Sequence, residues 1–242
     1  MRSVVVVIGA AGGIGRAVSA GQIECGHHVV AVDRDPAVLE MQARQLTPVV
    51  ADATARAHLA DVFDFATRTG DVTGLVHCVL ADARVPLANL DDESITQVFR
   101  AGAGSAVQAA RLLYQHSARP AACVLIGSIH AGFAAPSMTA YAMAKAALRA
   151  LNRSVAVEWG PEGLRCNLIE PGFVMVPRNA DRWKNEAERE RIQRAYPAPR
   201  LGSPADVAAV AGFLLSEQAG FVNGATIPVD GGASAILPEA VL

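Results

Sequence analysis

Short, unbroken apolar runs recur along the chain, with longer mixed segments between them. The runs are the predicted strands Val4–Ile8, His28–Val32, Val49–Ala51, Gly74–Val79, Cys123–Ile126, Cys166–Ile169 and Ala225–Val229. Because the runs are continuous rather than alternating, we expect each strand to be buried on both faces. That burial is typical of a parallel sheet covered by helices.

The segments between these runs have the length and apolar spacing of helices. The predicted helices are Ile14–Cys25, Pro36–Leu46, Thr54–Thr69, Asp92–Ala118, Ala140–Trp159 and Pro204–Ser216. Asp91 or Asp92 and Ser203 are typical helix starts, and Gly26 and Gly160 are typical helix stops. The alternation predicts a Rossmann-like, doubly wound α/β fold of about seven parallel strands with helices on both faces.

Composition narrows the class of protein. The chain has 242 residues, 52% hydrophobic and 18% charged, and no linker or repeat, so we expect residues 1–242 to form a single dinucleotide-binding and catalytic domain. A formal charge of −2 without any basic run argues against nucleic-acid binding. The longest aliphatic run, Val4–Ile8, is too short to span a membrane. Glycines follow it where the apolar core of a signal peptide would continue.

The cysteines bear on metal binding and on compartment. Cys25, Cys78, Cys123 and Cys166 lie far apart, with no C-x-x-C spacing. This spacing predicts neither a metal site nor a disulfide scaffold. We therefore expect reduced cysteines, no bound metal and a cytoplasmic protein.

One segment differs in composition from the rest. Between Asp181 and Arg194, nine of the fourteen residues are charged, with Trp183 inside the segment and Tyr196 just beyond it. One interpretation is a solvated amphipathic surface helix. The other is a substrate lid over residues 178–200, because the segment follows a Pro-Gly turn at the carboxyl end of a late strand.

The first strand leads directly into a glycine-rich turn, Gly9-Ala-Ala-Gly-Gly-Ile-Gly15. Bare backbone at a strand-to-helix turn lets a pyrophosphate approach the amide N–H groups and the positive end of the helix dipole. The spacing of Gly9, Gly13 and Gly15 is G-x-x-x-G-x-G rather than G-x-G-x-x-G. The turn, with Ile14 inside it, is therefore a candidate dinucleotide-binding site.

Charged residues after the second and third strands bear on which dinucleotide binds. Asp33 stands eighteen residues after Gly15, where a carboxylate can accept hydrogen bonds from both adenine-ribose hydroxyls and repel a 2′-phosphate. Arg34 could instead pair with a 2′-phosphate. Asp33 is closer to the expected ribose, so NAD(H) is favoured over NADP(H). Asp52 is either an adenine contact or a helix cap.

Ser128, Tyr141 and Lys145 form a second candidate site. Tyr141 and Lys145 are four residues apart on a predicted helix, so the ammonium can stabilise a phenolate and lower the pKa of the phenol. Such a tyrosine can act as general acid or base on a carbonyl or carbinol oxygen, to which Ser128 could donate a hydrogen bond. Lys145 is one of only two lysines among 21 Lys and Arg residues, which suits a role that needs a compact point charge.

Taken together, these motifs resemble the short-chain dehydrogenase/reductase family in its compact form, over essentially the whole chain. The resemblance is carried by Gly9-x-x-x-Gly13-Ile14-Gly15, Asp33, Asp52, Ser128, Tyr141-x-x-x-Lys145, Pro171-Gly172 and Val229-Asp230-Gly231-Gly232. It implies that Tyr141 is the catalytic acid/base, that Ser128 positions the reacting oxygen, and that Lys145 holds the nicotinamide ribose and tunes Tyr141.

The resemblance also implies a set of cofactor-binding residues and an assembly. The set comprises Gly9, Gly13, Ile14, Gly15, Asp33, Arg34, Asp52, Ala53, Cys78, Val79, Tyr141, Lys145, Pro171, Gly172 and Val174, of which Pro171, Gly172 and Val174 would lie against the nicotinamide. Members of the family are commonly homotetramers built on two long helices, here Asp92–Ala118 and Ala140–Trp159.

The leading hypothesis is an oxidoreductase that moves a hydride between NAD(H) and a small-molecule secondary alcohol or ketone. The alternative is a dinucleotide-binding sensor or partner subunit with weak or no turnover. A third possibility is a dehydratase or epimerase of the longer sugar-nucleotide branch, because Gly9, Gly12 and Gly15 also fit G-x-x-G-x-x-G. At 242 residues the chain lacks the extra substrate region of that branch.

Several positions depart from the family's pattern. The usual Asn-Asn-Ala-Gly after the fourth strand is His77-Cys78-Val79-Leu80, and Gly102 stands where a helix asparagine supports a water relay to the lysine. Ile8 and Val176 replace threonines. His130, two residues past Ser128, could contact a polar group of the substrate or be merely solvated. We expect these changes to affect turnover rate and cofactor orientation more than the fold.

Overall fold

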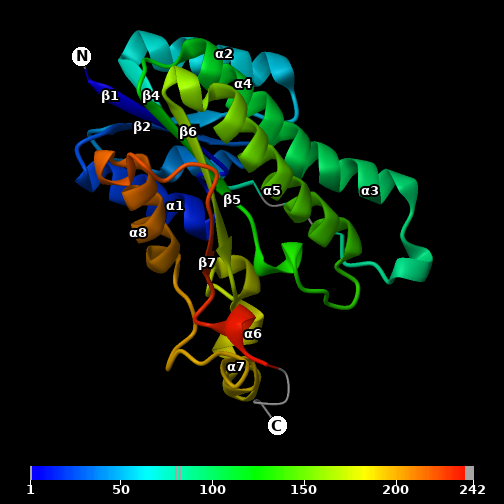
Figure 1. Cartoon of the computed structure of the whole chain (residues 1–242). Coiled ribbons are helices and arrows are strands. Elements are labelled where there is room, and N and C mark those ends of the chain that lie inside the picture. The colour runs from blue at the N-terminus through cyan, green and yellow to red at the C-terminus, as the bar shows by residue number, and fades with distance from the viewer. Residues whose placement is uncertain (1, 80, 82, 238–242) are drawn as a thin grey trace.

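A seven-stranded parallel sheet forms the centre of the molecule, in the order β3-β2-β1-β4-β5-β6-β7 (Figure 1). The computed structural model describes residues 2–79, 81 and 83–237. The strands are β1 (Ser3–Ile8), β2 (His28–Asp33), β3 (Leu46–Val50), β4 (Asp71–His77), β5 (Ala121–Ile126), β6 (Leu164–Pro171) and β7 (Thr226–Val229). The predicted doubly wound class is confirmed.

Helices cover both faces of the sheet (Figure 1). They are α1 (Gly13–Glu24), α2 (Arg56–Thr69), α3 (Asp92–Phe99), α4 (Ser105–His116), α5 (Thr139–Trp159), α6 (Ala180–Lys184), α7 (Glu186–Gln193) and α8 (Pro204–Leu215). Within the described part of the chain, no helix combines the length and the apolar character needed to cross a membrane.

Strand β1 shows why the apolar runs are continuous. Val4, Val6 and Ile8 pack into the core beneath α2, α4 and α5, while Val5 and Val7 pack into the opposite core beneath α1 and α8. Successive side chains of a strand point to opposite faces, so a strand covered on both sides needs apolar residues at every position. The five residues are at most 1% exposed.

The prediction of a helix over Pro36–Leu46 is wrong. A single 3-10 turn occupies Pro36–Glu40, and the chain then enters β3 at Leu46, earlier than the predicted Val49–Ala51. Pro48 lies inside this strand. Proline is tolerated there because β3 is at the edge of the sheet, where one side of the strand has no neighbour to receive an N–H group.

The predicted helix Asp92–Ala118 is divided rather than continuous. Residues 100–104 form a π-helical turn between α3 and α4, and this turn contains Gly102 and Gly104. Asp91 caps the start of α3 by accepting from the Ser94 N–H at 2.7 Å, which confirms the predicted helix start. Single π-helical turns are frequent at functional sites, and this one packs beside α5.

The strand order reverses between β1 and β4. The chain runs outward from β1 to β3 and then returns to β4 on the other side of β1. In open α/β sheets the crevice at the carboxyl ends of the strands beside such a reversal is where ligands bind. The glycine-rich turn after β1 and the residues after β4 both lie at this crevice.

Candidate active site

The glycine-rich turn brings the ends of β1 and β4 together. Gly9 has a positive φ of 84°, and a Cβ at that position would stand 2.9 Å from the Cys78 carbonyl carbon. A Cβ on Gly15 would collide with the backbone of Gly9. Gly12, the N-cap of α1, has no side chain to cap the first N–H groups. The turn is thus a bare backbone cradle at a positive helix end, which fits a pyrophosphate.

Asp33, the last residue of β2, faces this turn. Its Oδ2 accepts a hydrogen bond from the Ala11 N–H at 2.9 Å, and its Oδ1 accepts from the Asp35 N–H at 3.0 Å. Arg34 is exposed. The carboxylate is therefore fixed beside the glycine-rich turn, where it was expected to face an adenine ribose.

The N-cap of α2 is Ala55, without a side-chain cap, so the prediction of a helix cap at Asp52 is wrong, and Asp52 instead closes a turn before the helix. Its carboxylate accepts from the Thr54 N–H at 2.8 Å and from the Thr54 hydroxyl at 2.9 Å. The backbone hydrogen bond from Thr54 is the main cause that lowers the pKa of Asp52. Ala53 beside it is buried. Contact of either residue with an adenine remains a prediction.

Sequence reasoning missed Arg16 in this half of the site. Its Nε donates to the Ala11 carbonyl and its Nη2 to the Ala37 carbonyl, each at 2.9 Å. The guanidinium therefore ties the glycine-rich turn to the loop after β2. No spacing signal could have revealed this, because Ala37 meets the turn only through the pairing of β1 with β2.

The structure brings Ser128, Tyr141 and Lys145 to one place. Ser128 follows β5, and Tyr141 and Lys145 lie on the inner face of α5; all three are at most 8% exposed. The Lys145 Nζ donates to the Ile126 carbonyl at 2.7 Å and to the Val79 carbonyl at 3.3 Å. It also lies 5.7 Å from the centroid of the Tyr141 ring. The ammonium thus links the ends of β4 and β5 to α5.

Burial sets the charge states around Lys145. Burial lowers the pKa of Lys145 to about 8, so the ammonium still predominates at neutral pH. Burial, followed by the charge of Lys145, lowers the pKa of His77 to about 3, so this imidazole is neutral. Burial raises the pKa of Cys78 to about 12, which keeps its thiol protonated. One positive charge therefore dominates this part of the site.

The residues that depart from the family's pattern form part of the same core. His77 is fully buried, and its Nε2 lies 2.8 Å from the Ser105 hydroxyl, which in turn donates toward the Gly102 carbonyl at 3.2 Å. A Cβ on Gly102 would lie 3.5 Å from the Ala144 Cβ, one residue before Lys145. His77 thus ties the end of β4 to the π-helical turn, which itself packs beside α5. Leu80 lies outside the described residues.

His130 lies beside the tyrosine. Its ring is 5.8 Å from the Tyr141 ring in an edge-on arrangement, and its backbone N–H donates to the Ser128 Oγ at 3.2 Å. Burial lowers the pKa of His130 and favours a neutral ring. The Ser128 oxygen accepts this bond through a lone pair, so the bond does not occupy its hydroxyl proton.

The turn after β6 lies against the glycine-rich turn. Gly172 donates its N–H to the Val229 carbonyl at 3.1 Å, and Val174 is buried. A Cβ on Gly13 would stand 2.7 Å from the Val176 Cγ1, so the segment that follows Pro171 touches the start of α1. The predicted glycine-rich turn, Pro-Gly turn and Ser-Tyr-Lys cluster thus meet at the carboxyl edge of one sheet.

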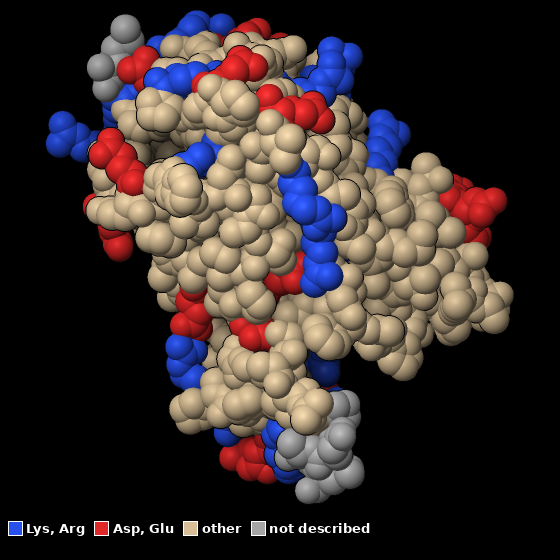
Figure 2. Space-filling model, in the orientation of Figure 1, with Lys and Arg blue, Asp and Glu red and all other residues tan. Residues whose placement is uncertain are grey.

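The charged segment folds as α6 and α7 below this edge, where acidic and basic side chains gather (Figures 1 and 2). Glu188 of α7 pairs with Arg182 of α6 at 3.1 Å and with Arg191 at 2.8 Å. The Trp183 Nε1 donates to the Val176 carbonyl at 3.0 Å, and the Phe173 N–H donates to the Tyr196 hydroxyl at 2.7 Å. Both ends of the segment are thereby attached to the Pro-Gly turn region.

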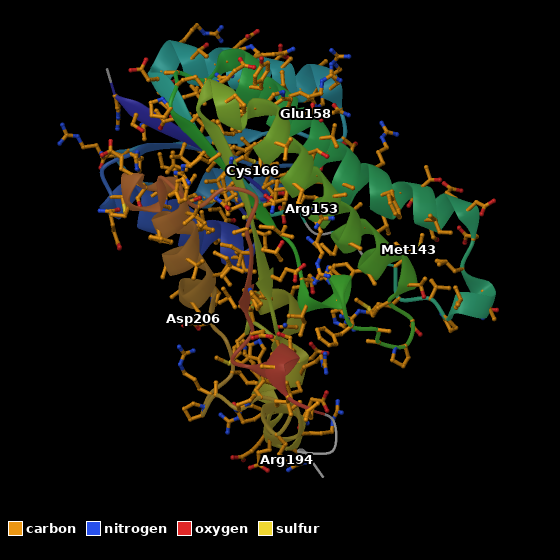
Figure 3. The ribbon with its side chains drawn as sticks, viewed as in Figure 1. Met143, Arg153, Glu158, Cys166, Arg194 and Asp206 are labelled. Carbon is orange, nitrogen blue, oxygen red and sulfur yellow. The ribbon has the colours of Figure 1, made fainter. Side chains whose placement is uncertain are left out.

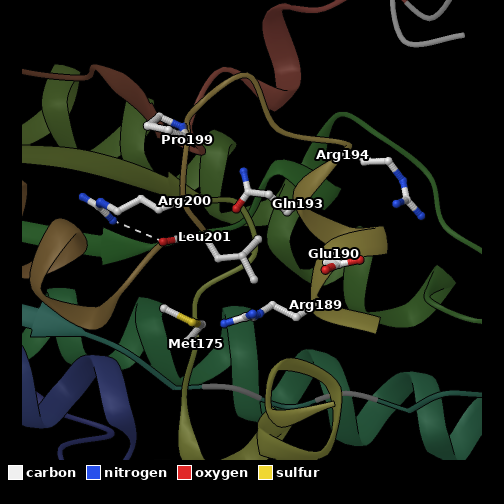
Figure 4. A pocket seen from close by; sticks show the side chains of 8 residues that line it. All are labelled: Met175, Arg189, Glu190, Gln193, Arg194, Pro199, Arg200 and Leu201. Atoms are coloured by element: carbon white, nitrogen blue, oxygen red, sulfur yellow. Dashed lines mark hydrogen bonds between the residues drawn. The ribbon is translucent and has the colours of Figure 1, made fainter. Parts of the chain in front are cut away.

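A cavity of about 520 Å³ opens beside α7 (Figure 4). Its walls include Met175 and Leu201 on the apolar side, and Arg189, Gln193 and Arg194 on the side of α7. None of Ser128, Tyr141 and Lys145 lines it. Among the described residues there is no group of three or more His, Cys, Asp or Glu side chains that could hold a metal ion.

Residues 9–234 match the family model described as enoyl-(acyl carrier protein) reductase. An inactive 2-(S)-hydroxypropyl-CoM dehydrogenase 2 from Xanthobacter autotrophicus is 33% identical, over 88% of this chain and 98% of that protein. An L-rhamnose 1-dehydrogenase (NAD(P)(+)) from Sphingomonas is 31% identical, over 94% of each chain.

Solved structures agree with these relatives. A short-chain dehydrogenase/reductase family oxidoreductase from Burkholderia thailandensis superposes with a TM-score of 0.90 at 31% identity, covering 99% of this chain and 96% of that one. A gluconate 5-dehydrogenase from Burkholderia cenocepacia, in complex with NADP and tartrate, gives a TM-score of 0.89 at 26% identity, covering 98% and 96%. The chain belongs to the short-chain dehydrogenase/reductase family, a family of oxidoreductases.

Proposed function

We propose that this protein transfers a hydride between NAD(H) and a small-molecule secondary alcohol or ketone. The observation that carries the proposal is the meeting of Ser128, Tyr141 and Lys145 at the carboxyl edge of the sheet, across from the bare backbone cradle of Gly9–Gly15. When bound, the nicotinamide supplies the hydride acceptor or donor. The protein binds, orients and manages the proton.

Each side chain of the cluster has a chemical role in this proposal. Tyr141 exchanges a proton with the reacting oxygen as general acid or base. Ser128, whose oxygen accepts from the His130 N–H, donates its hydroxyl proton to the same substrate oxygen. Lys145 uses two of its three N–H donors on carbonyl oxygens and keeps one for a ribose hydroxyl. Its charge favours the phenolate form of Tyr141.

Exchange of Tyr141 for phenylalanine tests this proposal. Tyr141→Phe deletes the phenolic oxygen, so hydride transfer should fall by about 10²–10⁴-fold while NADH affinity stays within a few-fold. Turnover is followed at the NADH absorbance with a panel of secondary alcohols and ketones, and affinity by calorimetry. Full activity of Tyr141→Phe would refute the role of Tyr141. A wild type that binds NADH but turns over nothing in the panel would favour the sensor alternative.

We infer a preference for NAD(H) from the position of Asp33. A 2′-phosphate would stand against a carboxylate that two backbone N–H groups hold beside the glycine-rich turn. Like charges at contact distance cost on the order of 1 kcal/mol or more. Titration of both reduced cofactors should give tighter binding of NADH. Tighter binding of NADPH would show that Arg34 governs the ribose site.

A homotetramer and a cytoplasmic location complete the proposal. Val107 on α4 and Met143 and Val157 on α5 are 40%, 46% and 75% exposed, and Met143 points outward from α5 in Figure 3. Apolar side chains on these two helices favour association of subunits through them. Light scattering checks the mass in solution.

All four cysteines are free, which supports a reducing compartment.

A further inference from the structure

An ion pair joins α5 to β6 directly behind the candidate active site. The Arg149 Nε and Nη2 donate to the two carboxylate oxygens of Glu170 at 2.6 and 2.7 Å. The Glu170 side chain is only 4% exposed, and that of Arg149 is 33% exposed. A bidentate pair of this kind fixes the relative orientation of the two side chains as well as their distance, because the planar guanidinium matches the plane of the carboxylate.

The two partners stand at chemically important places in the chain. Arg149 lies one helical turn after Lys145 on α5, and Glu170 immediately precedes Pro171 and Gly172. The pair therefore connects the helix that carries Tyr141 and Lys145 to the turn expected beneath the nicotinamide.

Glycines at both ends of the loop that carries Ser128 leave room for this pair to lie close to the loop. A Cβ on Gly127, just before Ser128, would lie 3.2 Å from the Glu170 Cγ. A Cβ on Gly132, at the end of the same loop, would lie 3.0 Å from the Arg149 Nη2. The Ser128 loop, α5 and the end of β6 thus meet at a single ion pair.

We propose that the Arg149–Glu170 ion pair is a positioning element for the reaction. It holds the Ser128 loop and the Pro171–Gly172 turn in register with Tyr141 and Lys145. Rates of reaction are sensitive to displacements of about 1 Å, so a pair that fixes three segments at once affects turnover more than binding. This inference rests on the proposed function of the three active-site side chains.

Removal of one charge and removal of both charges separate positioning from mere stabilisation. E170Q leaves Arg149 without its counter-charge and should lower both stability and kcat. R149M/E170L replaces the pair with apolar side chains, and such replacements often restore stability. We expect the double variant to recover the unfolding midpoint of the wild type and yet keep a kcat about 10- to 100-fold low, with KM and NADH affinity within about threefold.

Arg165 offers a matched control on the same strand. Its guanidinium donates to the Leu214 carbonyl at 2.9 Å and to the Ser216 carbonyl at 3.1 Å, at the end of β6 away from the site. R165M should lower the unfolding midpoint and leave kcat unchanged. R149K, which keeps the charge but loses the planar fork, gives an intermediate kcat and serves if E170Q fails to fold.

A second readout does not depend on turnover. Hydrogen exchange of the backbone amides at 127–132 and 172–173 should be faster in E170Q and R149M/E170L than in the wild type, and unchanged in R165M. If the wild type turns over no substrate, the proposed function fails, and these exchange rates alone decide the positioning role. A double variant with wild-type kcat, or unchanged exchange at both segments, would overturn the inference.

Discussion

The two halves of the sheet build their parts of the site in different ways. On the β1–β3 side, the cradle is made of backbone, and its shape depends on atoms that are missing from Gly9 and Gly15. On the β4–β6 side, the site is made of buried polar and charged side chains, among them Lys145, His77 and Glu170. We therefore expect the first half to lose its shape when an atom is added to a glycine. We expect the second half to lose stability when a buried charge loses its partner.

This difference has a thermodynamic consequence. A backbone cradle costs the fold little beyond the entropy of its glycines. A buried ammonium or imidazole destabilises the fold unless its hydrogen bonds offset desolvation. The β4–β6 half therefore holds groups that are poorly placed for stability, as expected where a sequence serves a function such as the proposed one.

The largest effect should come from Lys145→Met. Turnover should fall by about 10²–10⁴-fold, because the charge that favours the phenolate is lost. Burial lowers the pKa of Lys145 from 10.5 to about 8, so the unfolded chain binds the extra proton between these values and wild-type stability rises with pH across that window. The variant should lack this rise and be no less stable at pH 7. Denaturant melts at several pH values measure it.

Arg153→Met, on the exposed face of the same helix (Figure 3), is the control for Lys145→Met. It should leave both turnover and the pH dependence unchanged. A Lys145→Met protein that is much less stable than wild type at pH 7 would mean that the bonds to the Ile126 and Val79 carbonyls outweigh the burial of the ammonium.

The loss of stability at acidic pH, the acid limb of the stability curve, should depend on His77. Its pKa is lowered from 6.5 to about 3 by burial, so the unfolded chain takes up a proton first as the pH falls. Stability is therefore lost between pH 6.5 and about pH 3, by at most about 5 kcal/mol. His77→Asn should flatten this limb in denaturant melts, whereas the exposed His58→Asn should not. Parallel acid limbs in both variants would contradict the prediction.

The backbone half should respond to an added methyl group. Gly9→Ala forces a side chain onto a backbone at φ 84° and against the Cys78 carbonyl, so we expect a loss of roughly 1–3 kcal/mol and at least about tenfold weaker NADH binding. Gly21 on α1 has open space around it, and Gly21→Ala should instead stabilise by roughly 0.5–1 kcal/mol. Unfolding and NADH titration of both proteins provide the comparison.

The sequence predicted the features that are local in the chain. The turn from Gly9 to Gly15 and the pair Tyr141 and Lys145 could be found because the roles proposed for them depend on spacings of a few residues. The edge strand β3 was misplaced because helix-like spacing from Pro36 onward competed with a strand that contains a proline. The π-helical turn at 100–104 was not predicted, because the helical pattern continues on both sides of its glycines.

Long-range pairs could not be predicted. Arg149 and Glu170 are 21 residues apart and meet only because α5 packs on β6. A charged residue at the end of the buried run Cys166–Ile169 was the only signal available for Glu170. Arg16 is likewise placed by the pairing of strands, and not by any motif.

The smallest effect on function should come from the hydrogen bond that attaches the charged segment to the Pro-Gly turn region. The Tyr196 hydroxyl accepts from the Phe173 N–H at 2.7 Å, and burial raises the pKa of Tyr196, so the group stays neutral over the working pH range. Tyr196→Phe leaves a partly buried N–H without its acceptor, which costs roughly 1–3 kcal/mol. Because Phe173 follows the Pro-Gly turn, KM should rise a few-fold while NADH affinity stays unchanged.

Tyr114 provides the matched comparison for Tyr196. Its hydroxyl donates to both oxygens of Glu162 at 2.8 Å on an exposed surface away from the charged segment. Tyr114→Phe should cost only a few tenths of a kcal/mol, since water replaces the lost bond, and should leave KM unchanged. Equal KM values in the two variants would mean that a substrate does not sense how α7 is attached. The cavity beside α7 would then have no part in substrate binding. A rise in KM confined to Tyr196→Phe would instead tie the charged segment to the substrate side of the site.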